Sequence, residues 1–272
     1  MADHAHNLRA SFSAGTGKKA KPIGVITRGT TGVNRLRRFD RWCFHHSAVR
    51  SLVRDGDALA LDVGYGASHT TTVEWGRWLH RLDPSMRVIG LEINPERVLE
   101  PQGGVTFELG GFELAGYQPQ LVRAFNVLRQ YDVDQVEAAW ETVLSRLAPG
   151  GLFFEGTCDE IGRRCTWITL SHDGPQELTL AWHPWGISTP SDIAERLPKV
   201  LIHRNIPGEK IHTLLSAADK AWDYAAGWEP YGPRVRWEKA RAMLIDEGWP
   251  ITTSRRRTGD SLLTIPWDAV AP

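Results

Sequence analysis

The sequence predicts an α/β fold in which a mostly parallel sheet carries helices on both faces. Short apolar runs alternate with helical segments from residue 58 to residue 158, the order typical of strand–helix–strand units. A glycine-containing turn follows the first apolar run, and a carboxylate, Glu92, follows the second. The chain of 272 residues is long enough for one such domain with additions.

The first predicted strand covers Leu59 to Val63 and leads into Gly64-Tyr65-Gly66. Two glycines one residue apart let the backbone turn tightly and approach a ligand where a Cβ would clash. A helix predicted from Thr70 to Leu82 begins beside this turn. These features predict the opening half of a nucleotide-binding unit.

The second predicted strand, Arg87 to Leu91, delivers Glu92 at its carboxyl end. Open α/β sheets bind ligands at this edge, and a carboxylate there can accept hydrogen bonds from two ribose hydroxyls. A dinucleotide fingerprint requires a third glycine and an acid about 20 residues further on. Here His69 occupies the third glycine position, and Glu92 lies 92 − 66 = 26 residues beyond Gly66. The spacing therefore fits NAD poorly.

Three more strands and one helix follow in the order of such a unit. The predicted strands cover residues 104–109, 119–125 and 152–155, and the predicted helix covers residues 133–147. The fourth strand ends at Asn126, and Pro149-Gly150-Gly151 precedes the fifth.

Over residues 56 to 158 these motifs resemble the class I S-adenosylmethionine-dependent methyltransferase family. The resemblance implies a Rossmann-like, mostly parallel seven-stranded sheet and S-adenosyl-L-methionine as cofactor. It implies that Asp62 touches the methionine part, that Glu92 holds the ribose, and that Asn126 lies beside the transferring methyl group. The full implied cofactor set in this segment is Asp62, Gly64, Tyr65, Gly66, Glu92, Ile93 and Asn126. Either Glu108 or Glu113 would take the place of the adenine-contacting acid.

The N-terminal region divides into a basic tail at residues 1–22, which is expected to be disordered, and a cap segment with a helix at residues 23–55. Within the cap, Arg28 and Thr30 lie in a loop of glycines, hydroxyls and arginines. A guanidinium matches a carboxylate, so both residues are predicted to clamp the cofactor's carboxylate or part of the substrate. A surface turn before a helix at residues 35–53 is the equally open alternative.

The C-terminal region, residues 159–272, is predicted to add a hairpin, helices and a final strand pair to the core at residues 56–158. The hairpin covers residues 166–171 and 177–182, the helices cover 208–226 and 234–247, and the last pair covers 249–253 and 262–267. The family resemblance implies antiparallel sixth and seventh strands. The C-terminal pair is predicted to form them, because it follows a helix, and the earlier hairpin is interpreted as an addition.

Acid–base candidates in this region are Asp159, His203 and His212, beside Asn126 of the core. Asp159 lies on a polar loop after the fifth strand, and His212 follows Glu209 by three residues, which would place both on one helix face. Such a pair could hold a metal or orient a base, but a hydrogen-bonded structural histidine is the more common case. The three cysteines match no zinc spacing and are expected to be reduced. No metal ligand is assigned, and metal dependence stays open.

Charge and hydropathy restrict the remaining function classes. No apolar run approaches the roughly 18 to 20 residues of a membrane span, and the N-terminus lacks the apolar core of a signal peptide, so a cytoplasmic location without membrane contact is expected. Residues 1–54 hold eleven Lys or Arg against two acids, although the chain is neutral overall. This basic arm could contact nucleic acid, could be a solvated tail, or could pair with the acidic remainder of the chain.

The sequence is therefore interpreted as a methyltransferase enzyme that O- or N-methylates a small-molecule acceptor. The twelve tryptophans are consistent with an aromatic acceptor cleft or simply with the core. Three alternatives stay open: an RNA-modifying methyltransferase, an NAD-dependent oxidoreductase, and a non-catalytic S-adenosylmethionine-binding protein. The acceptor and the oligomeric state are not predicted.

Overall fold

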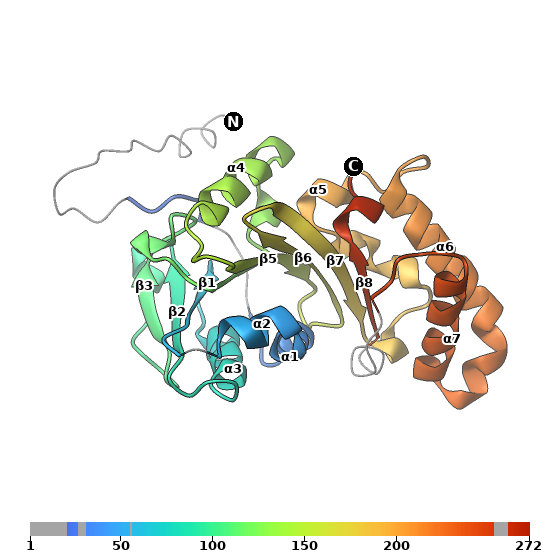
Figure 1. The fold of residues 1–272 in the computed structure, drawn as a ribbon, viewed down its shortest axis with the longest axis horizontal. Coiled ribbons are helices and arrows are strands. Elements are labelled where there is room, and N and C mark those ends of the chain that lie inside the picture. Colours follow the sequence, from blue (N-terminus) through green and yellow to red (C-terminus); the bar gives the residue numbers. More distant parts are fainter. Residues whose placement is uncertain (1–20, 27–30, 55, 253–260) are drawn as a thin grey trace.

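The computed structural model describes residues 21–26, 31–54, 56–252 and 261–272. These residues form one mixed sheet of eight strands with helices on both faces (Figure 1). The α/β class and the layering are confirmed, and the sheet has eight strands rather than seven. Most of the predicted tail, together with Arg28 and Thr30, lies outside the described residues.

The parallel part of the sheet follows the predicted order. Its strands are β1 (Leu59–Val63), β2 (Arg87–Glu92), β3 (Thr106–Leu109), β4 (Leu121–Phe125) and β5 (Leu152–Cys158). They lie side by side as β3-β2-β1-β4-β5, all parallel. The chain order therefore reverses between β1 and β4. In sheets of this kind, ligands bind in the crevice outside the carboxyl ends of the strands at such a reversal.

The antiparallel part of the sheet corrects the prediction for the sixth and seventh strands. The earlier hairpin, β6 (Arg164–Ser171) and β7 (Gly174–Trp182), continues the sheet directly from β5, and β8 (Leu262–Pro266) pairs with β7 at the edge. The reason is the short connection: β6 starts six residues after β5 ends, so the chain can only return antiparallel beside it. Residues 249–252 form no strand, although the Thr252 amide donates to the Thr264 carbonyl at 2.8 Å.

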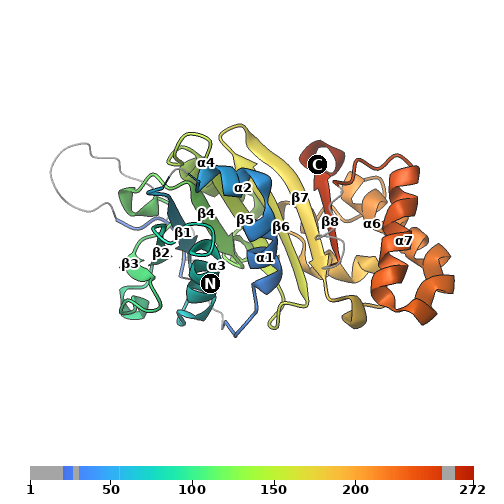
Figure 2. The same cartoon turned by 60° about the horizontal axis from the view of Figure 1, so that its bottom comes forward.

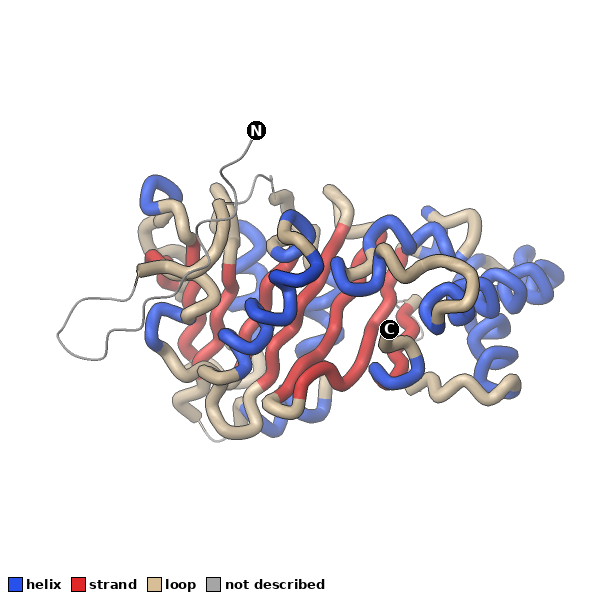
Figure 3. The backbone as a smooth tube through the Cα atoms, turned by 90° about the horizontal axis from the view of Figure 1, so that it is seen from above, coloured by secondary structure: helices blue, strands red, loops and turns tan. Residues whose placement is uncertain are grey.

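The helices lie in two layers around the sheet (Figures 1, 2 and 3). One layer holds α1 (Arg37–His45), α2 (Ser47–Leu52) and α3 (Thr70–Leu79), and the other holds α4 (Val133–Leu144) and α5 (Lys199–Ile202). The pair α6 (Lys210–Tyr224) and α7 (Pro233–Asp246) lies at the β8 end of the molecule. The helix predicted at residues 35–53 is interrupted at His46, whose backbone is extended. Among the described residues, no helix has the length and apolar character of a membrane span.

A 3-10 helix, η5 (Pro190–Arg196), follows the hairpin. Its start has the residues that favour one, because Thr189 precedes Pro190 and Asp192 lies in the first turn. Asp192 accepts from the Ser188 amide at 2.7 Å and from the Thr189 amide at 3.4 Å. The turn is therefore fixed locally, but it does not extend into an α-helix.

A buried ion cluster joins the sheet to the α1–α3 layer. Arg123 of β4 is fully buried, and its guanidinium donates to Asp40 of α1 at 2.8 Å and to Asp62 of β1 at 2.7 Å. It also donates to the Thr71 carbonyl at 2.8 Å and lies 4.4 Å from the centre of the Trp75 ring. Burial raises the pKa of Asp40 to about 7, against the opposing effect of Arg123. The cluster ties four elements together through one cation.

Glu155 in the middle of β5 is another buried acid, and no ion pair compensates its charge within the part of the chain that the structure describes. Its side chain is fully buried, and neither carboxyl oxygen has a hydrogen-bond partner among the described residues. Burial raises its pKa to about 8. The carboxyl is therefore protonated in the folded protein at neutral pH.

Replacing Glu155 with methionine is expected to stabilise the protein, and increasingly so as the pH rises. The folded pKa of Glu155, about 8, lies above its unfolded value, so the folded state holds the proton more tightly. Stability of the unmodified protein then falls as the pH rises from about 4.5 towards 8. At pH 8 the gain should be on the order of 1 to 3 kcal/mol. Denaturant unfolding at several pH values measures it; equal stability of both proteins at every pH would contradict the burial argument.

Candidate active site

The predicted glycine turn after β1 lies at the reversal of strand order. Gly64 and Gly66 both have positive φ, 71° and 81°, a conformation that favours glycine. A Cβ on Gly64 would lie only 2.6 Å from Cγ2 of Val127, in the loop after β4. The Gly64 amide also donates to the Leu91 carbonyl at 2.7 Å. The glycine thus allows the loops after β1 and β4 to approach each other.

Glu92 connects this turn to the end of β2. It is only 1% exposed; its Oε2 accepts from the Gly66 amide at 3.0 Å and its Oε1 accepts from the Asn94 amide at 3.0 Å. Each carboxylate oxygen can accept a second hydrogen bond. Two backbone donors therefore hold this carboxylate in a fixed orientation while capacity for two further donors remains.

A cavity opens beside Glu92 at the carboxyl ends of the strands. Three of the sequence-predicted cofactor residues, Gly64, Glu92 and Ile93, line it. The other lining residues are Ile23, Gly24, Val25, Val63, Gly110, Gly111, Phe112, Val127 and Tyr131. Apart from Glu92 and the Tyr131 hydroxyl, the lining side chains are apolar. The wall therefore suits a flat, largely apolar ring next to a hydroxyl-bearing group.

The segment Ile23–Val25 occupies part of this cavity, and it is called the strap below. The Ile23 carbonyl accepts from the Phe112 amide at 2.9 Å, and the Ile23 amide donates to Glu113 at 2.6 Å. At the other end the Val25 amide donates to Oη of Tyr131 at 2.6 Å. The remaining room is about 20 Å³, space for about one water molecule. With the strap in this position, the cavity is too small for a nucleoside.

Contacts of the strap also explain the residues that follow the third strand, β3. Gly111 is required there, because a Cβ at this position would overlap the Ile23 carbonyl oxygen. Of the two candidate adenine-contacting acids, Glu113 accepts from the Gly111 and Ile23 amides, whereas Glu108 accepts from the Tyr117 hydroxyl at 2.9 Å. Glu113 thus holds the strap and the Gly111 backbone, next to the lining residues Gly111 and Phe112 but not among them.

Two other predicted cofactor residues direct their side chains into the protein interior. Asp62 accepts from Arg123 and, at 2.8 Å, from the Thr72 hydroxyl. The Tyr65 ring packs on Phe107, and its hydroxyl donates to the Arg97 carbonyl at 2.7 Å. The carboxylate of Asp62 is thus primarily a partner of Arg123, and Tyr65 can contribute only its backbone to the turn.

Asn126 lies between the ends of β4 and β5. Its φ of 61° is unusual for a residue with a side chain, and its amide N–H donates to the Gly156 carbonyl at 2.8 Å. The side-chain Oδ1 accepts from the Cys158 amide at 2.9 Å, and Nδ2 donates to the Cys158 sulfur at 3.3 Å. Asn126 is half-buried beside Val127, which lines the cavity. It is thus fixed at the edge of the site.

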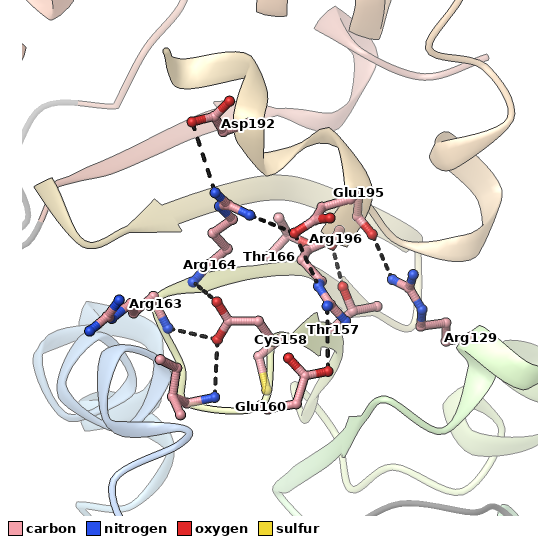
Figure 4. A network of polar contacts seen from close by, with 12 residues as sticks. Arg129, Thr157, Cys158, Glu160, Arg163, Arg164, Thr166, Asp192, Glu195 and Arg196 are labelled. Carbon is pink, nitrogen blue, oxygen red and sulfur yellow. Dashed lines mark hydrogen bonds and ion pairs between the residues drawn. The ribbon is translucent and has the colours of Figure 1, made fainter. Parts of the chain in front are cut away.

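A polar network covers the adjacent ends of β5 and β6 (Figure 4). The hydroxyls of Thr157 and Thr166 both donate to the Arg196 carbonyl of η5. From the loop after β4, Arg129 donates to the Glu195 carbonyl at 2.7 Å, and Arg164 pairs with the Glu195 carboxylate at 2.6 Å. The network fixes η5 over the strand ends next to Asn126. Sequence patterns did not reveal it, because its members come from four separate segments.

Asp159 has a structural role in this network. Its carboxylate accepts from the amides of Ile161, Arg163 and Arg164 at 3.3, 2.8 and 3.1 Å. These bonds shape the loop between β5 and β6, as aspartate does in many turns. These bonds fix the carboxylate to its own loop and leave one of its four acceptor positions, on Oδ2.

The two histidine candidates lie outside the cavity. His203 is exposed at the end of α5, and His212 is in α6, at the opposite end of the molecule from β1–β3 (Figure 1). His212 contacts Asn205 at 3.3 Å, while Glu209 pairs with Arg204 at 2.9 Å. Glu209 precedes α6 rather than sharing a helix face with His212. Within the described ranges, no group of three or more His, Cys, Asp or Glu side chains could hold a metal ion.

Comparison with known proteins gives matches only among solved structures. No family model and no curated protein sequence matches the chain. Magnesium protoporphyrin IX methyltransferase from Synechocystis PCC 6803 with bound S-adenosylhomocysteine aligns at 16% identity and a TM-score of 0.32, covering 48% of this chain and 62% of that one. Human N-acetylserotonin methyltransferase aligns at 18% identity and a TM-score of 0.31, and the alignment covers 44% of this chain and 36% of that one. A cyclopropane synthase from Mycobacterium tuberculosis aligns at 15% identity and a TM-score of 0.29, and the alignment covers 38% of this chain and 37% of that one.

These alignments are partial on both sides. The chain spans less than two thirds of each of the three proteins it matches. At such identities and TM-scores the matches do not decide an activity. The case for a function therefore rests on the residues of the cavity itself.

Proposed function

We propose that the protein is an S-adenosylmethionine-dependent methyltransferase that O- or N-methylates a small-molecule acceptor. The single observation that supports this most is the orientation of Glu92. Its carboxylate is buried at the reversal of strand order, held by two backbone amides, and able to accept from two ribose hydroxyls. The poor NAD spacing after Gly66 favours this cofactor over a dinucleotide.

Different residues of the cavity would contact different parts of the cofactor. Glu92 would accept from the ribose, and the apolar side chains of Ile93 and Val127 would contact the adenine ring. The Gly64–Gly66 turn would let the backbone approach the methionine part. When bound, S-adenosylmethionine supplies an already activated methyl group, so the protein has mainly to position an acceptor and exclude water. Asn126 at the edge of the cavity is the residue proposed to lie nearest to that reaction.

The segment η5, held by its polar network, is proposed to cover the acceptor. Arg129, Thr157 and Thr166 donate to backbone carbonyls of this segment and hold it over the ends of β5 and β6, next to Asn126. No general base is assigned, because the Asp159 carboxylate is used by the loop. An acceptor that ionises in solution, or a neutral amine, would need none.

A turnover assay tests this proposal without knowledge of the acceptor. The protein is incubated with S-adenosylmethionine and either a small-metabolite fraction or an RNA fraction, and formation of S-adenosylhomocysteine is measured by mass spectrometry. Product in the metabolite fraction is expected. Product only with RNA would favour the nucleic-acid alternative, and binding of the cofactor without product in either fraction would favour a non-catalytic protein.

The strap gives a prediction for affinity. With the strap in place the cavity is too small for a nucleoside, so the strap must move before a nucleoside can enter. The free energy of moving the strap then reduces the observed binding free energy. Tyr131→Phe removes the hydroxyl that accepts from Val25. We expect S-adenosylhomocysteine to bind roughly 5-fold more tightly, corresponding to about 1 kcal/mol for one hydrogen bond. Calorimetry measures the change, and Tyr117→Phe, outside the cavity, is the control. Weaker binding would show that the strap is part of the bound site.

A further inference from the structure

Two of the three cysteines lie directly opposite each other at the end of the sheet nearest Asn126. Cys158 is the last residue of β5, Cys165 is the second residue of β6, and the register pairs them. The next pair outward is a hydrogen-bonded one, since the Asp159 amide donates to the Arg164 carbonyl at 3.0 Å. Cys158 and Cys165 therefore form a non-hydrogen-bonded pair.

This position has the geometry that a disulfide requires. In a non-hydrogen-bonded antiparallel pair the Cα atoms lie about 4.5 Å apart and the side chains project to the same face. Disulfides bridge Cα separations of about 4.4 to 6.8 Å. Both thiols are present as free thiols and are fully buried. A bond between them would close a loop of eight residues without moving the strands apart.

The two thiols are chemically unequal. The hydrogen bond from Cys165, assisted by the Arg35 charge and by Asn126, lowers the pKa of the Cys158 thiol to about 7 despite burial. Burial raises the pKa of Cys165. The third cysteine, Cys43, lies in the apolar core of α1, where burial raises its pKa to about 12. Cys158 is therefore the most nucleophilic sulfur of the three, with a protonated thiol beside it.

We propose that Cys158 and Cys165 are a redox site that hydrogen peroxide oxidises to a reversible cross-strand disulfide. The Cys158 thiolate attacks one peroxide oxygen, which breaks the O–O bond and gives a sulfenic acid and one water after proton transfer. The Cys165 sulfur then displaces the sulfenic oxygen as a second water and forms the S–S bond. Two thiols lose two electrons and one peroxide gains them, so the step balances. Peroxide is small enough for a site without exposed sulfur.

The disulfide would act on the edge of the active site. It replaces the Cys158 thiolate, which accepts from Nδ2 of Asn126, with a disulfide sulfur that is a weaker acceptor, and it restrains the loop over Cys158 that Figure 4 shows. The same loop receives Arg35, which donates to the Asp159 carbonyl at 2.8 Å. An effect on methyl transfer rests on the proposed function, whereas formation of the bond does not.

Mass spectrometry tests the chemistry on the intact protein. After treatment with peroxide, the protein is denatured and alkylated. The reduced chain takes up three alkyl groups, one for each cysteine. We expect uptake to fall to one group after oxidation, with Cys43 alkylated and a peptide cross-link between Cys158 and Cys165, and to return to three after a dithiol reductant. Full uptake after oxidation, or a cross-link that includes Cys43, would overturn the proposal.

Two cysteine variants test whether the oxidation requires Cys158 and Cys165 together. Cys43→Ala should oxidise as the unmodified protein does, and Cys165→Ala should instead accumulate an oxidised Cys158 without a cross-link. If either variant does not fold, peptide mapping of the unmodified protein still decides. S-adenosylhomocysteine binding is measured separately on the oxidised and reduced forms: a disulfide with no cofactor binding in either form would contradict the proposed function and leave the redox site standing.

Discussion

Replacing Arg123 with methionine is expected to lower the free energy of unfolding by about 3 to 5 kcal/mol, the largest effect predicted for a single residue in this protein. The variant leaves the carboxylates of Asp40 and Asp62 buried without their shared cation. The loss should shrink as the pH falls, because burial raises the pKa of Asp40 to about 7 and its protonation removes one uncompensated charge. Denaturant unfolding at pH 8 and at pH 5 measures both effects.

The matched control is Arg77→Met on α3, where the arginine is exposed. A surface substitution of this kind should change stability by less than about 0.5 kcal/mol. An Arg123 variant as stable as this control would show that the buried cluster contributes little. Asp62→Ala should also destabilise the fold, so a weaker affinity in that variant has to be compared with its stability before a direct cofactor contact is inferred.

Replacing Glu92 with glutamine is expected to weaken S-adenosylhomocysteine binding roughly 10- to 150-fold. The amide keeps the shape of the side chain but exchanges one acceptor oxygen for a donor group. Losing a hydrogen bond to a charged partner costs about 1.5 to 3 kcal/mol. Stability should fall too, because the Gly66 or Asn94 amide loses its acceptor. Calorimetric titration at a temperature where the variant is folded measures the affinity.

The control for this variant is Glu96→Gln, an exposed carboxylate four residues further along the chain. It should bind the ligand as the unmodified protein does. Unchanged affinity in the Glu92 variant would place the cofactor elsewhere. Reduced affinity in both variants would indicate a general electrostatic effect instead.

The core at β1 and β2 could be predicted from the sequence because its signals are local. Gly64, Gly66 and Glu92 lie within one strand–helix–strand unit, where turn chemistry and strand ends determine their positions. The strands β3 to β5 followed for the same reason. The final strands were predicted wrongly, because both hairpins show similar patterns and only the short loop after β5 distinguishes them.

Long-range contacts explain the rest of what the sequence did not reveal. The sequence did not reveal the buried cluster of Arg123, because its partners Asp40 and Asp62 lie 83 and 61 residues away along the chain. The strap was missed as well, since the Ile23 amide meets Glu113 across 90 residues. Its apolar character gave no sign that it would fold into the site. Sequence reasoning therefore grouped Gly64, Gly66 and Glu92, which the structure brings together, but did not reveal the strap beside them.

The central claim is that the cavity beside Glu92 binds S-adenosylmethionine. The most direct test is calorimetric titration of the unmodified, reduced protein with S-adenosylmethionine and S-adenosylhomocysteine, with NAD as the control ligand. Dissociation constants on the order of 1 to 100 μM for the first two, without binding of NAD, are the predicted result. Binding of NAD without binding of either sulfur ligand would contradict the claim.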